Sequence, residues 1–472
     1  MTDTKTLLAS EKFIFDYEPR SRHAVRVGIG FPNTYSVGMA SLGYQLVWHM
    51  FRTQPGISVF RFFLPEKEAE PLTLEDGLSL RSMDILAFSV SFEMDYINLL
   101  SMLQRAGIPL FSKDRGEDAP LVLVGGPVSL INPAPLYGFA DAVYIGDLET
   151  SYEEIASVFA QKHDTDRRGI LEKLAGLEGM TVPALGKKGV RQTEHELDRY
   201  CCHSVICTPH AGFGDTLLFE TARGCARGCR FCAAGNTTKP MRLRRPVLPD
   251  YASYGMVGAA VFDAPGSITL CREFVRKKAA FSLSSLRLET LDEEKLMLMK
   301  AGGILTVTVA PEAGTERLRN HIGKACPDDV ILRAAGLTCE AGFGKMKLYF
   351  MTGLPGETDG DIIGTAELLQ RLRRLYPRLK LSASAGIFVP KPGTPFGGEQ
   401  QPPAKELERR LSLLKQKQPK GVDITYESPR LARVQWILAQ ADEKLGGAFL
   451  QKSLEGGYRA GLRYYDSVIS EK

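Results

Sequence analysis

The chain has 472 residues, of which 44% are hydrophobic and 24% charged, and its formal net charge at pH 7 is +4. These proportions exclude a disordered chain and fit a globular protein of two or three domains. The small net charge excludes a general attraction to nucleic acid or membranes. No apolar run reaches the roughly 18 residues that cross a bilayer. The amino terminus has no signal-peptide pattern, so a cytoplasmic protein is expected.

The first predicted domain, residues 1–155, alternates strand and helix patterns. Short buried runs predict strands at 25–31, 57–65, 83–92, 119–128 and 140–147. With helical patterns between them, they predict an α/β fold, a doubly wound parallel sheet with helices on both faces. Ligands bind such sheets at the carboxyl ends of the strands.

Residues 156–215 are predicted to be a linker, after which strand and helix patterns alternate again over 216–395. Candidate strands of this second domain are 216–222, 258–263, 281–290, 304–313, 346–353 and 381–389. Six strand–helix units are too few for a closed eight-fold barrel and predict an open, partial (β/α)6 barrel. Residues 396–472 are predicted to form a small helical C-terminal region.

A cysteine cluster follows the first strand of the predicted barrel. Three of the nine cysteines, Cys225, Cys229 and Cys232, lie within eight residues. An odd number of cysteines without an export signal argues against a disulfide framework. Three thiolates can hold three irons of a 4Fe–4S cluster and leave the fourth iron open to a substrate or cofactor. The alternatives are three buried thiols or a zinc loop, for which no fourth ligand stands at finger spacing.

The Cys-x3-Cys-x2-Cys spacing, with Phe231 before the last cysteine, resembles the signature of the radical S-adenosylmethionine (SAM) superfamily. The resemblance implies a 4Fe–4S cluster whose open iron chelates SAM. An electron from a reductant such as flavodoxin or ferredoxin then cleaves SAM to methionine and a 5′-deoxyadenosyl radical. Segment 257–266 lies where the family contacts the SAM amino group, but it lacks the usual Gly-Gly-Glu, and Asp263 is its nearest carboxylate. In segment 309–320, Glu312 would meet the ribose.

The domain before the barrel resembles the cobalamin-binding-domain subgroup of this superfamily. Its similar segments are 31–45 and 125–149. In the barrel, segment 345–361 resembles the fourth-strand segment of methylthiotransferase-like and cobalamin-linked members. The resemblance implies that cobalamin binds at the carboxyl edge of the first sheet. The loop at 33–38 lacks the Asp-x-His-x-x-Gly motif, so we expect no histidine ligand to cobalt from it. The alternative is a sheet that kept its shape and binds no cobalamin.

Four residues at this edge are the candidate cobalamin contacts. Gly125 and Gly126 follow one strand and would let the backbone approach the cofactor closely. Ser89 and Ser91 follow another and would donate hydrogen bonds to its phosphate and amides.

The resemblance implies an enzyme, a cobalamin-dependent methyltransferase acting on an unactivated carbon of an unknown small molecule or peptide. The alternatives are a cobalamin-linked rearrangement, cyclisation or oxidation, and a sensing module that binds cobalamin or an iron–sulfur cluster without catalysis. RNA methylthiotransferases also carry the signature, but they have three cysteines in their first domain, and this chain has none before Cys201. We interpret the basic residues at 219–246 as charge balance, and no nucleic-acid partner is expected.

Overall fold

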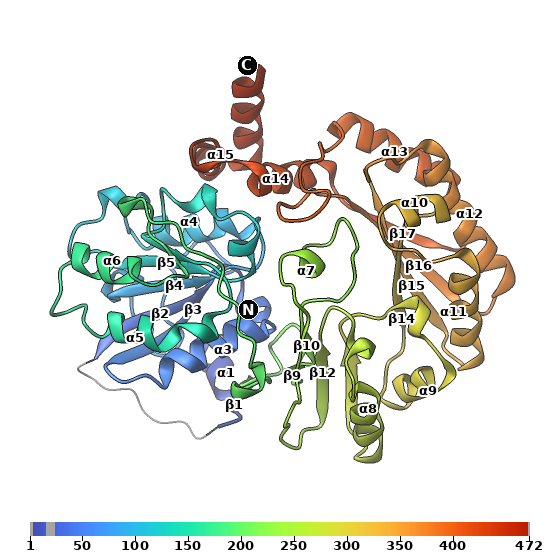
Figure 1. Cartoon of the computed structure of the whole chain (residues 1–472), viewed down its shortest axis with the longest axis horizontal. Helices are drawn as coiled ribbons and strands as arrows, with labels where there is room; N and C mark the ends of the chain where they lie inside the picture. Colours follow the sequence, from blue (N-terminus) through green and yellow to red (C-terminus); the bar gives the residue numbers. More distant parts are fainter. Residues whose placement is uncertain (1–2, 16–23, 471–472) are drawn as a thin grey trace. The chain divides into compact units, whose positions relative to one another are not determined.

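The computed structural model describes residues 3–15 and 24–470. It consists of two compact units (Figure 1). Unit 1 contains Met1–Thr216 together with Ile437–Lys472, and unit 2 contains Leu217–Trp436. Among the helices that the structure describes, none is long and apolar enough to cross a membrane.

Unit 1 is built on a six-stranded sheet in the order β3-β2-β4-β5-β6-β7. Its strands are β2 (Val25–Phe31), β3 (Ile57–Phe63), β4 (Ile85–Ser89), β5 (Leu121–Gly125), β6 (Ala142–Tyr144) and β7 (Met180–Thr181). The first five are parallel, and β7 runs antiparallel to β6. This strand order confirms the predicted doubly wound sheet. The direction in which successive strands are added to the sheet reverses between β2 and β4, and doubly wound folds bind ligands at such a point.

Helices cover both faces of this sheet (Figure 1). The helices of unit 1 are α1 (Thr4–Ala9), α2 (Tyr35–Met39), α3 (Leu42–Arg52), α4 (Asp95–Arg105), α5 (Tyr152–Phe159), α6 (Arg167–Ala175) and α15 (Glu443–Ser470), the last of which packs against α4. A short antiparallel pair, β1 (Lys12–Phe13) with β8 (Ile206–Cys207), completes the unit. Segment 156–215 therefore contributes α6, β7 and β8 to unit 1 in addition to leading into unit 2.

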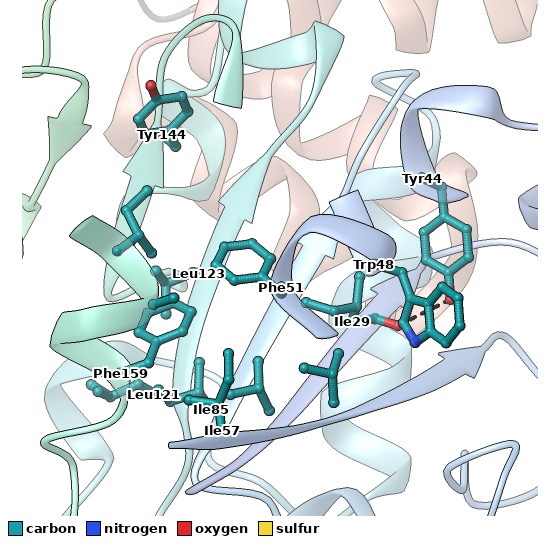
Figure 2. Packing of buried hydrophobic residues seen from close by; sticks show 14 of the residues in the cluster. Ile29, Tyr44, Trp48, Phe51, Ile57, Ile85, Leu121, Leu123, Tyr144 and Phe159 are labelled. Atoms are coloured by element: carbon teal, nitrogen blue, oxygen red, sulfur yellow. Dashed lines mark hydrogen bonds between the residues drawn. The ribbon is translucent and has the colours of Figure 1, made fainter. Parts of the chain in front are cut away.

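The core of unit 1 joins the sheet to α3 and α5 (Figure 2). Phe51 and Phe159 stack with ring centroids 5.6 Å apart. The hydroxyl of the fully buried Tyr44 donates a 3.1 Å hydrogen bond to the carbonyl oxygen of Ile29. The sheet is thus packed by apolar side chains and by a satisfied polar contact.

Unit 1 also contains a buried ion network around Arg61 on β3. Its guanidinium donates two 2.7 Å hydrogen bonds to Glu11 and one of 2.8 Å to Glu75. The three side chains are between 0% and 9% exposed. Charges this deeply buried are stable only when paired, so each carboxylate depends on the guanidinium.

Unit 2 has a three-stranded sheet, β13-β12-β9, and a four-stranded sheet, β14-β15-β16-β17. The strands are β9 (Leu217–Glu220), β12 (Ser253–Val257), β13 (Ala280–Leu283), β14 (Val307–Glu312), β15 (Lys345–Thr352), β16 (Lys380–Ile387) and β17 (Asp423–Tyr426). All neighbours are parallel. The first six strands confirm the predicted partial barrel, which is divided between β13 and β14.

The helices of unit 2 follow its strands. They are α7 (Ala233–Asn236), α8 (Ser267–Arg276), α9 (Glu293–Ala301), α10 (Glu316–His321), α11 (Asp328–Glu340), α12 (Asp359–Leu375), α13 (Ala404–Lys417) and α14 (Pro429–Gln440). An antiparallel hairpin, β10 (Ala222–Arg223) with β11 (Arg242–Leu243), lies between β9 and β12.

Two predictions about unit 2 were wrong in detail. The strand predicted at 258–263 is instead β12, at Ser253–Val257, and a 3-10 turn occupies Val261–Asp263. The chain leaves the sheet at Gly258 because the Ser284 hydroxyl bonds both backbone polar groups of that glycine. The C-terminal region is helical as predicted but also contains β17, which extends the four-stranded sheet.

The ion network predicts a strong dependence of unit 1 on Arg61. We expect Arg61→Met to lower the free energy of unfolding by about 3–5 kcal/mol, because it removes the buried guanidinium that Glu11 and Glu75 share. The measurement is urea unfolding followed by Trp48 fluorescence in a Trp436→Phe background, because the chain has only two tryptophans.

The matched control is Arg168→Met, which removes an exposed pair with Glu172. Exposed pairs contribute little, so this variant should unfold like the parent. Equal unfolding curves for the two arginine variants would contradict the prediction.

Candidate functional site

The three clustered cysteines of unit 2 lie in a loop whose ends are tied together. The hairpin of β10 and β11 closes the loop. Glu220, the last residue of β9, accepts hydrogen bonds of 2.9 Å from both Arg223 and Arg244. Burial opposes the charge of Glu220, yet the two guanidinium groups hold its pKa below the ordinary value. Two of the basic residues noted in the sequence therefore fix the loop to the first barrel strand.

Backbone and amide contacts shape the loop around the cysteines. The side-chain amide of Asn236 donates to the carbonyl oxygens of Cys229 at 3.0 Å and Cys232 at 2.8 Å. Gly224 has a φ of +83°, and a side chain there would meet the carbonyl oxygen of Thr238 at 2.5 Å. A larger residue at that position would displace the segment that leads into Cys225.

The other side of the loop rests on the turn after α10. The Arg230 amide donates to the Ile322 carbonyl at 2.9 Å, and the Arg230 guanidinium lies 4.6 Å from the Phe396 ring centroid. Gly323 has a φ of +73°, and a side chain there would come within 2.9 Å of the Gly228 carbonyl oxygen. The cysteine loop is therefore held on two sides.

The electrostatics of Cys229 show that the three thiols lie close to one another. Burial raises the pKa of Cys229, and so do Cys225, Cys232 and Glu312, whereas Lys324 lowers it. All three thiols are free and half-buried. Thiolates that raise one another's pKa favour a cationic occupant that offsets their charge.

The donor set fits an iron–sulfur cubane better than a single metal ion. No three His, Cys, Asp or Glu side chains of the described ranges converge as one ion requires. In a cubane each thiolate binds its own iron, so the sulfurs need not meet at one point. A zinc ion would require a fourth ligand in a tetrahedron. The cysteine loop therefore fits a 4Fe–4S cluster with three protein ligands.

Glu312, the predicted ribose contact, lies beside this loop in an irregular backbone. The ladder between β14 and β15 shifts register between Val309 and Glu312, and Glu312 has a φ of +70°. Its carboxylate accepts a 2.8 Å hydrogen bond from the ammonium of Lys324. Burial raises the pKa of Glu312, against the effect of Lys324. A bulge and a strained φ here direct a charged pair towards Cys229.

Asp263, the predicted contact for the SAM amino group, lies in the turn after β12. One nitrogen of Arg287 donates to both carboxylate oxygens, at 2.7 and 2.6 Å. Burial raises the pKa of Asp263, and Arg227 of the cysteine loop opposes that effect. Asp263 is therefore near the cysteine loop, with its carboxylate oriented by Arg287.

The four candidate cobalamin contacts lie together at the carboxyl edge of the unit 1 sheet. Ser89 and Gly125 end neighbouring strands and face each other in register. Ser89 is buried and Ser91 exposed. Gly126 has a φ of +100°, and a side chain there would lie 2.5 Å from the Val90 carbonyl oxygen. The close approach at Gly126 is therefore to the chain's own backbone, whereas a Cβ at Gly125 would meet only the Tyr144 Cβ, at 4.0 Å.

A polar cluster that the sequence analysis missed lies where the strand order reverses. Asp95 accepts hydrogen bonds from the side chains of Asn33 at 3.0 Å and Asn98 at 3.1 Å. Burial raises the pKa of Asp95. The cluster joins the loops after β2 and β4. Its signal in the sequence was an Asn and an Asp, each shortly after a predicted strand.

The end of the chain packs on the same edge of unit 1. Asn132 donates to the carbonyl oxygens of Leu438 at 3.1 Å and Ala441 at 2.8 Å. The Tyr458 hydroxyl donates to the Met94 carbonyl at 3.2 Å. The C-terminal helices therefore contact the loops that follow β4 and β5.

Two family models match the chain. One describes the N-terminal part of radical SAM proteins and matches residues 43–183, and the other describes the radical SAM superfamily and matches residues 256–369. An uncharacterized protein of Methanocaldococcus jannaschii is 27% identical over 437 residues, 89% of each chain. An uncharacterized methyltransferase of Pyrococcus horikoshii is 23% identical over 70% of this chain and 74% of its own.

Two solved structures share the fold over most of the chain. TsrM from Kitasatospora setae, a radical SAM methyltransferase with cobalamin and a [4Fe-4S] cluster bound, matches with a TM-score of 0.54 and 16% identity. The match covers 81% of this chain and 80% of TsrM. OxsB, a cobalamin-dependent SAM radical enzyme, matches with a TM-score of 0.52 and 12% identity over 91% of this chain and 66% of its own.

The two family models together take in more than half of the chain, and the cysteine loop lies between them. The partial barrel and the doubly wound sheet are the fold of both solved relatives. The chain belongs to the radical SAM superfamily.

Proposed function

We propose that this protein is a cobalamin-dependent radical SAM methyltransferase. The observation that carries the proposal is the loop of three neighbouring thiols at the end of β9, with the Glu312–Lys324 pair beside Cys229. The doubly wound unit and the fold likeness to TsrM, whose structure has cobalamin and a [4Fe-4S] cluster bound, support the cobalamin part. The methyltransferase name of the Pyrococcus horikoshii relative supports the reaction type.

The residues of unit 2 would hold and orient the cofactors. Cys225, Cys229 and Cys232 would bind three irons. Glu312 would accept a hydrogen bond from the SAM ribose, with its carboxylate held by Lys324, and Asp263 would accept from the SAM amino group. When bound, the cluster and SAM supply a carbon-centred radical, and cobalamin supplies a methyl carrier. The protein's part is to fix these groups and exclude water.

The test of this proposal is metal content followed by methyl tracing. Protein purified anaerobically from cobalamin-fed cells should contain about four irons and one cobalt per chain. With a flavodoxin or ferredoxin system as reductant, the methyl group of isotopically labelled SAM should reach a product. Four irons without cobalt, or 5′-deoxyadenosine without any methylated product from the true substrate, would count against methyl transfer.

The same preparation tests the cluster ligands. Cys229→Ala should lose the iron and the visible absorption of the cluster, because two thiolates cannot hold the cubane as three do. Cys339→Ala, on the outer helix α11, should keep both. Full iron content in the Cys229 variant would show that the loop is not the cluster site.

A second prediction concerns Lys324. In Lys324→Met the Glu312 carboxylate loses its cation, so we expect SAM affinity to fall roughly tenfold, equivalent to about 1.4 kcal/mol. Iron content should stay at the parent value. Equilibrium dialysis of SAM and the change that SAM causes in the electron paramagnetic resonance spectrum of the reduced cluster measure the effect.

Lys417→Met, an exposed lysine of α13, is the matched control and should bind SAM like the parent. If Lys324→Met and Glu312→Gln both bind SAM normally, the pair has no part in the SAM site.

A third prediction concerns Gly125. A side chain built there meets only the Tyr144 Cβ, at 4.0 Å, so Gly125→Leu should fold while filling the edge of the sheet. We expect cobalt content to fall several-fold while iron stays unchanged. Gly116→Leu, in a surface loop with nothing within 4 Å, is the control. Unchanged cobalt in Gly125→Leu would place cobalamin elsewhere or nowhere.

A further inference from the structure

The four-stranded sheet of unit 2 has one apolar and one polar face. Residues such as Leu348, Phe350 and Leu381 are buried against α11 and α12. The alternate residues of β14 to β17, which we name the inner face, are half-buried or exposed. Side chains alternate along a strand, so the residues between those packed against the helices must lie on the inner face.

Polar side chains line up across the strands on the inner face. Thr308, Lys347 and Ser382 stand in register on β14, β15 and β16. One step along, Tyr349 stands in register with Ser384 on β16, and that strand pairs Ser384 with Thr425 on β17. Residues aligned in this way lie on the same side of the sheet and close together. The inner face thus has two neighbouring rows of hydrogen-bonding groups.

A cavity of about 210 Å³ adjoins these rows. It lies where β13 and β14 separate, and Tyr349 and Thr308 form part of its wall. Its other hydroxyl groups belong to Ser282, Ser284, Ser285 and Thr306. Within the described ranges, Ser282, Ser285, Thr306 and Thr308 make no side-chain hydrogen bond. Ser282 is exposed and the other three residues are half-buried, so these hydroxyl groups can bind a polar ligand.

Within the described residues, Lys345 and Lys347 are cations of the inner face that form no ion pair, and Lys347 is the one in register with the hydroxyl-bearing Thr308 and Ser382. Its ammonium lies 4.7 Å from the Tyr349 ring centroid, and it forms no ion pair with any residue of the described part of the chain. Tyr349 is 40% exposed, so the ring and the ammonium above it are open to a ligand.

The acidic groups near this face are already engaged. Glu312 accepts from Lys324 at 2.8 Å, and Asp423 lies 3.9 Å from the Lys380 ammonium. Glu427 accepts from the Ile387 amide at 2.7 Å. None of them neutralises Lys347, which leaves a positive site in a wall of hydroxyl groups.

We propose that this inner face binds an anionic oxygen group of the substrate, a carboxylate or a phosphate ester, with Lys347 as the charge partner and Thr308, Tyr349 and Ser382 as hydrogen-bond donors. Charge-assisted hydrogen bonds of this kind are stronger than neutral ones. The assignment rests on the proposed radical SAM function and names its substrate class. Lys347 lies roughly 16 Å before the end of β15 at about 3.3 Å per residue, so the anchored group lies deeper in the barrel than the cysteine loop.

The test is binding without turnover, on the reconstituted holoenzyme. Saturation-transfer difference nuclear magnetic resonance would compare sn-glycerol 3-phosphate, glycerate and glycerol at equal concentrations. We expect one or both anions to bind and glycerol not to bind, and the stronger anion identifies the group. Lys347→Met should weaken anion binding at least tenfold, and Tyr349→Phe should weaken it less, because the ring remains.

The control is Lys415→Met on the outer side of α13, which should leave anion binding unchanged. Equal binding of glycerol and the anions, or anion binding that survives Lys347→Met, would overturn the proposal. Iron content and SAM cleavage without substrate are measured on the same samples. If Lys347→Met loses anion binding but still cleaves SAM, the anion site is separate from the cofactor sites. This result does not depend on whether the enzyme transfers a methyl group.

Discussion

Hydrogen bonding between parallel strands places every loop that follows a strand at one edge of its sheet. In the three-stranded sheet of unit 2 this constraint gathers the cysteine loop after β9 and Asp263 after β12. Glu312 ends β14 of the other sheet, and its partner Lys324 follows the turn after α10 that contacts the cysteine loop. In unit 1 it brings together the ends of β4 and β5, at Ser89 and Gly125. Residues far apart in the sequence thus become neighbours through backbone pairing, independently of contacts between their side chains.

The charged groups at these edges lower the stability of the fold, which is typical of residues in a functional site and not of residues in a hydrophobic core. Glu312 combines a positive φ with a partly buried carboxylate, and each is unfavourable on its own. Lys324 offsets the charge but not the strain. Asp95 is a buried carboxylate whose hydrogen bonds come from the neutral side-chain amides of Asn33 and Asn98. By contrast, the charges of the Arg61 network on β3 are paired with one another, so stability and binding are carried by different charges.

The sequence predicted features that depend on local pattern. Buried runs located the strands of the first sheet, such as 25–31, and spacing alone identified the three cysteines. The strand at 258–263 was misplaced because apolar residues of a turn resemble a buried run, and only the distant Ser284 shows where the strand ends. Lys324 and Arg287 were missed because their roles come from partners on other elements. β17 was missed because four residues carry too little alternation.

The alternation along β15 explains how one strand can serve both the core and the inner face. Leu348 and Phe350 pack beneath the helices, so Lys347 and Tyr349 must lie on the opposite side. A slip of one residue would exchange the two sets, burying the ammonium and exposing the apolar side chains, and the core prevents it. The bulge in β14 adds one residue to that strand alone, and it sets Glu312 opposite Phe350. The register that fixes Lys347 is therefore kept on β15 and β16, while the extra residue on β14 frees Glu312 to turn towards Lys324 and the cysteine loop.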